Sequence, residues 1–314
     1  MTTEDSKKDS RVHDDEIDLR ELFVSLWKGK WFIIAVTFVF AVGSVLHALN
    51  LPNIYKSEVL LAPVAQEQNM RIPGQLGGLA ALAGVSLGAG SGTDKTTLAI
   101  EVLRSREFIG RFIEKYDLFV PVVAAIDWDI ATNTLILDKT AFNISTGQWV
   151  RDVKPPRKAK PSKLETYEEF MKLFNVSRDA SSGMVRLTIE HYSPYLAKEW
   201  LDYLVLEINE EMRQRELQEA ERSIAYLNEQ VASTTLSDAR TMLFSLIEEQ
   251  TKSLMLANVR KEFIFQTIDH AIVPEQKSSP RRALIVIVFT ILGGFFASVL
   301  VLIFNILFKT DKEA

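Results

Sequence analysis

The sequence of 314 residues contains no cysteine. Disulfide scaffolds, thiolate zinc sites, iron–sulfur clusters and cysteine nucleophiles are therefore excluded, whereas export stays open because exported proteins need not use disulfides. An excess of positive charge is lacking as well, since the formal net charge is −5 at pH 7. Broad binding of nucleic acid needs clustered Lys and Arg, so we expect no nucleic-acid partner.

Histidine is scarce, and the four that occur show no ligand spacing: His13, His47, His191 and His270. Zinc sites and metalloprotease helices need such residues at short, regular intervals. We therefore expect no metal and no cofactor.

Two short motifs resemble enzyme signatures but lack what makes them work. Gly84 to Gly88 reads G-x-S-x-G, a nucleophile elbow only on a tight strand-to-helix turn, and no strong strand precedes it. Gly90 to Thr97 (GSGTDKTT) resembles a phosphate-binding loop, but Asp94 stands where that loop needs glycine, and its charge would repel phosphate. We expect a non-enzymatic protein with no catalytic residue.

Two long apolar runs dominate the chain, at residues 31–49 and 283–308. As helices they reach roughly 28 and 39 Å, enough to cross a hydrocarbon core of about 30 Å. About 30 mostly polar residues precede the first run and no A-x-A-like cleavage site follows it, which favours an anchor over a removable signal peptide. We expect two transmembrane helices.

The basic residues beside these runs predict the orientation. Lys28 and Lys30 abut the first run, and Lys309 and Lys312 follow the second, which favours a cytoplasmic location for both termini. The opposite flanks also carry basic residues: Lys56, Lys277, Arg281 and Arg282. We let the basic residues beside the first span decide the orientation. Residues 50–282 are then expected on the side of the membrane opposite the cytoplasm.

The block between the spans predicts an α+β domain. Strands are expected at Ile54 to Pro63 and at Met184 to Tyr192, where apolar and polar residues alternate. Helical spacing covers Thr96 to Tyr116 and, more briefly, Tyr167 to Phe174. The basic, proline-rich stretch Arg151 to Lys163 is expected to be an exposed loop.

After Pro194 the pattern changes to a long, polar helix. Eight of the fourteen residues from Asn209 to Arg222 are charged, so this part projects into water and is held by local pairs such as Glu211 with Arg215. The pattern stops at Ser233, and Ser237 is expected to cap a second helix. A helical hairpin therefore occupies residues 194–260.

These expectations divide the chain as follows: arm 1–30; first span 31–49; α/β base domain 50–193 with a glycine-rich loop at 72–92; helical hairpin 194–260; returning strand and membrane approach 261–282; second span 283–308; tail 309–314. The glycine-rich loop is interpreted either as mobile or as a small-residue packing surface. Gly293 and Gly294 suit close packing in the second span, with simple lipid exposure as the alternative. Asp127, Trp128 and Asp129 are candidates for sugar contact or for a solvated turn.

Several segments carry a resemblance to a known family: IDLRELFVSLWKGKW (17–31), Tyr55 with Lys56, LRSREFIGRFI (103–113), AERSIAYLNEQ (220–230) and FQTIDHAIVP (265–274). In this order, and at these distances from the apolar runs, they resemble the Wzz-type polysaccharide co-polymerases, the chain length determinants of O-antigen and related glycans. The family has prolines at intervals of three before its second span. Here Pro274 and Pro280 are followed by Arg281 and Arg282, but Lys277 replaces the middle proline.

The resemblance implies a ring-shaped, octamer-like homo-oligomer in a Gram-negative inner membrane, with both termini cytoplasmic and the bulk periplasmic. It implies an O-antigen polymerase and a lipid-linked polysaccharide as partners. Pro274, Pro280, Arg281 and Arg282 would then guide the chain into the membrane. Glu211 and Arg215, within the helix around 210–222, would make subunit or polymer contacts.

Two alternatives remain at this stage. One is a capsule or exopolysaccharide export co-polymerase working with a separate tyrosine kinase, although only six residues follow Phe308 as a docking tail. The other is a two-span periplasmic sensor or adaptor, although the 30-residue amino-terminal arm is too short to fold as an effector domain.

Overall fold

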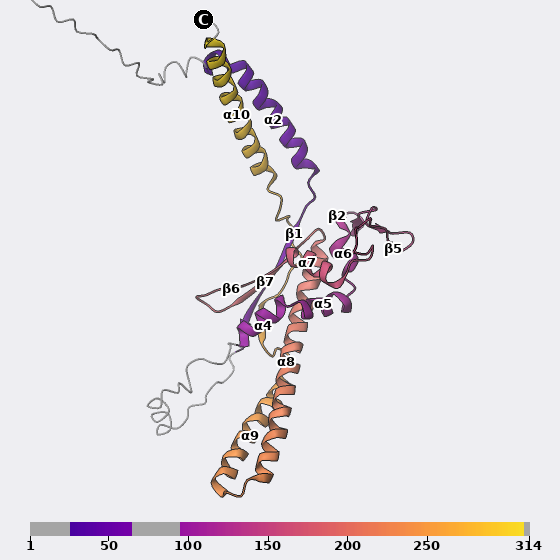
Figure 1. The fold of residues 1–314 in the computed structure, drawn as a ribbon, viewed down its shortest axis with the longest axis vertical. Helices are drawn as coiled ribbons and strands as arrows, with labels where there is room; N and C mark the ends of the chain where they lie inside the picture. Colours follow the sequence, from indigo (N-terminus) through magenta and orange to yellow (C-terminus); the bar gives the residue numbers. More distant parts are fainter. Residues whose placement is uncertain (1–25, 65–94, 311–314) are drawn as a thin grey trace, which may run out of the picture. The chain divides into compact units, whose positions relative to one another are not determined.

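The structure, a computed structural model, describes residues 26–64 and 95–310, with side chains as far as 304 (Figure 1). It divides into two units. Unit 1 comprises the chain up to Leu51 and from Pro280 onward, and unit 2 comprises Pro52–Ser279.

Unit 1 contains two apolar helices, α2 (Lys30–Asn50) and α10 (Arg282–Thr310). They pack antiparallel, because Gly29 lies against Val301 and Gly293 against Phe40. Their large apolar side chains are mostly exposed, for example Phe38 at 66%. A core helix of a soluble protein would bury such a face. Both helices are long and apolar enough to cross a membrane.

Unit 2 is built on a four-stranded antiparallel sheet in the order β6-β7-β1-β8. The strands are β1 (Tyr55–Pro63), β6 (Phe174–Arg178), β7 (Val185–His191) and β8 (Phe265–Asp269). Val59 pairs with Leu187, and both are buried with their alternate neighbours. With the helices described below, the sheet confirms the expected α+β class.

Beside the sheet lie α4 (Lys95–Arg104), α5 (Arg106–Lys115), α6 (Phe119–Val123) and α7 (Lys163–Leu173). The stretch 96–116, expected to be helical, is divided between α4 and α5. Ser105 leaves the helical conformation, and its hydroxyl accepts a hydrogen bond from the Phe108 amide, so it ends α4 and caps α5. The short helix expected at 167–174 begins earlier, because Ser162 caps α7 at the Glu165 amide.

Two small hairpins follow α6: β2 (Ala125–Asp129) with β3 (Thr134–Leu137), and β4 (Phe142–Asn143) with β5 (Gln148–Trp149). Their strands are too short to show a clear alternation in the sequence. The alternative of a solvated turn at Asp127–Asp129 was therefore wrong, since these residues lie in β2 and pair with β3.

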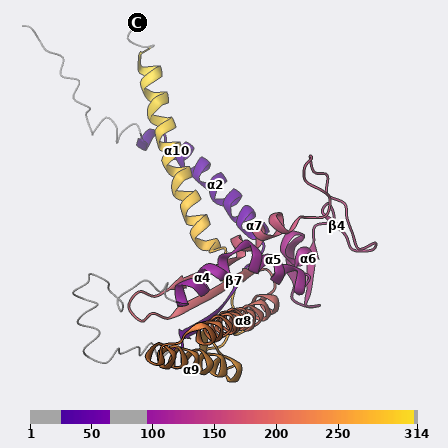
Figure 2. The same ribbon diagram turned by 60° about the horizontal axis from the view of Figure 1, so that its bottom comes forward.

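The remaining helices form a hairpin, α8 (Pro194–Ser233) and α9 (Ser237–Val259), which run side by side in both views (Figures 1 and 2). The first half of α8 packs on β1 and β7 and buries Trp200, Leu204 and Ile208. Beyond Met212 only Ala220 of α8 is buried. Ser237 does not cap α9, because Leu236 holds that position and Ser237 is already helical.

The returning strand occupies only part of the segment 261–282 in which it was expected. Only Phe265–Asp269 pair with β1, whose register shifts between Leu60 and Leu61. The amides of Ile264 and Phe265 donate to the Asn209 side chain, while the Ile264 carbonyl accepts from the Val64 amide just after β1. A side chain of α8 therefore holds the main chain at the start of β8.

Candidate functional site: a charged groove along the long helix

A seam of ion pairs joins α8 to α4 and α5. Glu207 and Glu211, four residues apart, share one side of α8, whereas Glu216, five residues further on, lies about 140° round the helix from Glu211. Their partners come from the two short helices: Lys115 to Glu207 at 2.6 Å, Arg111 to Glu211 at 2.8 Å and Lys95 to Glu216 at 2.7 Å. The glutamates are 16–18% exposed, so the seam lies at the edge of the core and orients α8 on the base.

Glu207 also holds an aromatic pair. The Tyr116 hydroxyl donates to Glu207 Oε1 at 2.8 Å, and the Tyr116 ring stacks on Tyr203 with 4.2 Å between centroids. Burial, then the hydrogen bond to Glu207, raises the pKa of the Tyr116 phenol to about 12. Tyr116 therefore remains a hydrogen-bond donor at physiological pH.

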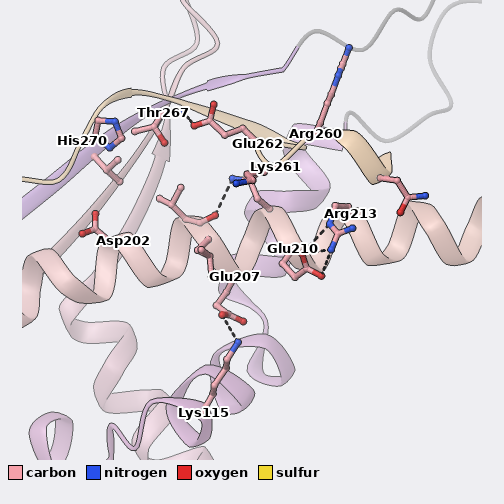
Figure 3. A pocket seen from close by; sticks show the side chains of 15 residues that line it. Lys115, Asp202, Glu207, Glu210, Arg213, Arg260, Lys261, Glu262, Thr267 and His270 are labelled. Carbon is pink, nitrogen blue, oxygen red and sulfur yellow. Dashed lines mark hydrogen bonds and ion pairs between the residues drawn. The ribbon is translucent and has the colours of Figure 1, made fainter. Parts of the chain in front are cut away.

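Next to the seam, and sharing Glu207 and Lys115 with it, a groove of about 850 Å³ opens between α8, β8 and the segment after α9 (Figure 3). Its charged lining has both signs: Asp202, Glu207, Glu210 and Glu262 with Lys115, Arg213, Arg260, Lys261 and His270. Figure 3 shows Lys115 reaching Glu207 and Arg213 lying beside Glu210. Such a wall offers donors and acceptors to a hydroxyl-rich ligand or to a polar protein surface.

The carboxylates of the groove are already bound. Arg213 donates to both oxygens of Glu210, and Gln214 adds a bond of 2.8 Å, so Arg213 first and then Gln214 hold the pKa of Glu210 below its ordinary value. Glu262 accepts from the Thr267 amide at 3.1 Å. A glycosidase needs one carboxyl group kept protonated opposite a carboxylate, and Glu210, whose pKa is lowered, does not provide it.

His191 and Lys95, the lysine of the motif at Gly90 to Thr97, both make contacts within the fold. His191 is buried, its Nδ1 accepts from the Ser193 amide at 3.1 Å, and its Nε2 lies 3.0 Å from the Pro121 carbonyl, to which it donates in that tautomer. Lys95 pairs with Glu216. Within residues 26–64 and 95–304, no group of three or more acidic or histidine side chains could hold a metal. The motif at Gly84–Gly88 and the loop 72–92 lie outside the described residues.

Trp128 is enclosed by two tyrosines. The centroid of its ring lies 5.7 Å from that of Tyr55 and 6.0 Å from that of Tyr195. Its Nε1 donates a hydrogen bond to Asn133. The flanking carboxylates serve the hairpin: Asp127 accepts from the Trp128 amide, while Thr132 and then the Ala131 amide lower the pKa of Asp129. Glu211 and Arg215 meet at 2.8 Å on the seam, separate from this cluster.

The residues expected to guide the chain into the membrane lie at the ends of both units. In unit 1, Arg282 donates to the carbonyl of Leu51, the C-cap residue of α2, at 2.8 Å, and the Arg281 carbonyl accepts in the first turn of α10. In unit 2, Lys277 binds Asn53 at 3.2 Å. The lysine that replaces the middle proline thus makes a hydrogen bond that proline could not.

Gly293 and Gly294 differ in their surroundings. A Cβ on Gly293 would lie 2.6 Å from Phe40 of α2, whereas one on Gly294 would meet Thr37 only at 3.4 Å. Both glycines of α10 therefore face a residue of α2, as the packing interpretation expects, and Gly293 makes the closer contact.

Sequence reasoning missed the seam and Asn209. Asn209 is 4% exposed and binds the backbone before and within β8. The sequence offered one indication that Asn209 is buried: it is an uncharged residue next to Ile208, at the end of an apolar helix face. Nothing in the sequence identified its partner more than fifty residues away.

Comparison with known proteins identifies a family that part of the chain matches. Residues 15–116 match the family model described as chain length determinant protein, Wzz. No curated protein sequence matches the chain significantly. One solved structure, described as a full-length bacterial polysaccharide co-polymerase, is similar at 13% identity and a TM-score of 0.40, covering 93% of this chain and 99% of its own. The match confirms, over residues 15–116, the resemblance to the Wzz chain length determinant family that was drawn from the sequence.

Proposed function

We propose that this protein regulates the length of a surface polysaccharide, O-antigen or a related glycan, without catalysing a reaction itself. The observation that carries the proposal is the family match over residues 15–116, which includes α2, β1, α4 and α5. The matched region therefore holds the first apolar helix, one central strand of the sheet and all three cations of the seam.

The proposed location is a Gram-negative inner membrane, with both termini cytoplasmic and unit 2 periplasmic. The exposed apolar surfaces of α2 and α10 support two spans. Because the chain has no cysteine, single-cysteine labelling tests the orientation. A maleimide that cannot cross membranes should label Ser182→Cys once the outer membrane is permeabilised, and Ser6→Cys only after the inner membrane is broken. The reverse pattern would overturn the topology.

The proposed working form is a homo-oligomer that acts with the glycan polymerase and the lipid-linked polysaccharide. Support comes from α9, whose large apolar side chains are exposed along its length: Met242, Phe244, Leu246, Met255, Leu256 and Val259. Monomeric soluble surfaces rarely expose so many together, and a second copy of the hairpin would cover them. A second hairpin packed against α9 would also lie near the groove and its charged residues.

The decisive experiment compares lipopolysaccharide on gels from the parent strain, a strain lacking this protein and the complemented strain. We expect the deletion to remove the modal cluster of bands while glycan is still made, and the full chain to restore it. Unchanged lipopolysaccharide with loss of a capsule or exopolysaccharide would point to an export co-polymerase instead. Unchanged glycans of every class would contradict chain-length regulation.

A further inference from the structure

Residues 125–160 form a small lobe that comprises both short hairpins and the loop that follows them. We call this segment the hairpin lobe. In both views it lies at the opposite end of unit 2 from the turn between β6 and β7 (Figures 1 and 2). The two hairpins are joined at Asp138, whose amide donates to Ala124 and whose carbonyl accepts from Phe142. The lobe is therefore one connected structure.

Each hairpin exposes an isoleucine as the first residue of its turn. Ile130 follows β2 and is 68% exposed, and Ile144 follows β4 and is 61% exposed. Turns favour Gly, Asn, Asp, Ser and Pro, and these turns do contain such residues after each isoleucine. A bulky apolar side chain at the tip adds nothing to the turn itself. Further apolar side chains of the lobe are exposed as well: Ile126, Ile136 and Val150.

The loop after β5 adds exposed positive charge. Arg151 folds this loop back, because its guanidinium donates to the carbonyls of Lys158 and Ala159 and pairs with Glu165. The other basic side chains of the loop are exposed: Lys154, Arg157, Lys158 and Lys160. The lobe has six basic and four acidic residues, so it is positive in a chain whose net charge is −5.

The lobe is attached where the chain enters and leaves unit 2. The Trp128 ring of β2 contacts Tyr55, the first residue of β1, and next to it Ile54 pairs with Ser279. Four residues join α2 to β1, and two residues lie between Ser279 and α10. The apolar tips and the basic loop thus belong to the end of unit 2 that continues directly into both apolar helices.

We propose that the hairpin lobe docks on the lipid surface of the membrane, with Ile130 and Ile144 inserted among the headgroups and the basic loop bound to anionic lipid phosphates. The inference rests on the proposed two-span topology, which brings this end of unit 2 to a bilayer. Binding of peripheral segments scales with inserted apolar area plus attraction to anionic lipid, and the lobe has both. Trp128 and Tyr195 add aromatic rings suited to the interfacial zone.

Spin labels on single cysteines test this proposal in the full chain. Ile130→Cys and Ile144→Cys carry the label at the tips, Ser182→Cys places it in the turn between β6 and β7 as a matched control, and Phe38→Cys places it on α2. Each protein is reconstituted into nanodiscs of phosphatidylcholine with phosphatidylglycerol. Collision rates with oxygen, which concentrates in lipid, and with a water-soluble nickel chelate report the surroundings of each label.

We expect the labels at Ile130 and Ile144 to collide with nickel several-fold less often than the Ser182 label. Reversing the loop charge with Lys154→Glu, Arg157→Glu and Lys158→Glu should raise the nickel collisions of the Ile130 label toward those at Ser182. The matched reversal of Arg260 and Lys261 in the groove should leave them unchanged.

Two outcomes overturn the inference and separate it from the topology. If the Phe38 label lies in lipid but the tip labels are as accessible to nickel as the Ser182 label, the lobe does not dock and the spans stand. If the Phe38 label is itself accessible to nickel, the two-span topology fails together with the inference. Equal protection of the tips in detergent, without a bilayer, would assign them to contact with a second copy and also overturn it.

Discussion

The side-chain amide of Asn209 and the main chain of Phe265 exchange two hydrogen bonds in opposite directions. Asn209 Oδ1 accepts from the Phe265 amide at 3.0 Å, and Nδ2 donates to the Phe265 carbonyl at 3.1 Å. Oδ1 also accepts from the Ile264 amide at 2.9 Å. The side chain thus substitutes for a neighbouring strand at the point where the chain returns from α9 to the sheet.

Asn209→Ala should strongly destabilise unit 2. It leaves three buried backbone groups without partners, and at about 1 kcal/mol or more each this predicts a loss of about 3 kcal/mol. For a unit of this size, the Tm of the detergent-solubilised chain should fall by about 6–12 °C in circular dichroism. Asn258→Ala is the control, because Asn258 is exposed and bonds only within α9. Similar melting of both variants would show that the Asn209 bonds contribute little.

The two partners of the ion pair between Lys115 and Glu207 should contribute unequally. Lys115 is 58% exposed, so Lys115→Ala should cost at most about 0.5 kcal/mol, an effect that salt screens. Glu207→Ala should cost about 1–2 kcal/mol, because it also leaves the Tyr116 hydroxyl without its acceptor. Thermal melts at low and high salt separate the two contributions. Equal costs, both lost in salt, would contradict a role for the Tyr116 bond.

His191 predicts a pH dependence of stability. Burial lowers the pKa of this imidazole below the ordinary value of 6.5, so below that pH the unfolded chain binds more protons than the folded one. The free energy of unfolding should therefore fall as pH drops below about 6.5 and level off once the folded imidazole is also protonated. Denaturant unfolding at a series of pH values measures this slope.

The matched variants of that experiment are His191→Gln and His270→Gln. Glutamine can still donate to Pro121 and accept from Ser193, but it does not titrate, so His191→Gln should flatten the slope near pH 6. His270 is exposed at the groove, and its replacement should leave the slope in place. A slope that survives His191→Gln would assign the dependence to other groups.

The two glycines of α10 should respond differently to a single methyl group. Gly293→Ala places a Cβ 2.6 Å from Phe40 and must push α2 and α10 apart, whereas Gly294→Ala meets Thr37 at 3.4 Å, and Gly43→Ala meets nothing within 4 Å. We expect only Gly293→Ala to lower the melting temperature of the helix pair in detergent and to shorten or broaden the glycan length distribution. Phe40→Gly, which removes the Cβ that lies 2.6 Å away, should partly restore both. Identical behaviour of Gly293→Ala and Gly43→Ala would show that this contact is not needed.

Local patterns in the sequence were sufficient for the features that depend on neighbours in the chain. Apolar runs of membrane-spanning length, the alternation at Val185 to Ile189 and the polar helix around Glu211 and Arg215 each follow from the 1.5 Å rise of a helix or the two-residue repeat of a strand. The α+β class and the family resemblance followed from the same segments. The domain boundaries, the residues expected to guide the chain into the membrane and the subunit contacts remain predictions.

Only the tertiary structure decided which distant residues meet. The cations of α4 and α5 face glutamates about one hundred residues away, Asn209 binds the main chain at the start of β8, and Ser105 divides the helical stretch 96–116 because its hydroxyl has an amide to cap. Each contact joins groups whose separation along the chain carries no periodic signal, so hydrogen bonding and burial select it only after the elements have packed. The sequence by itself therefore determined the class of the fold and its apolar helices, while packing determined the seam, the groove and the strand ends.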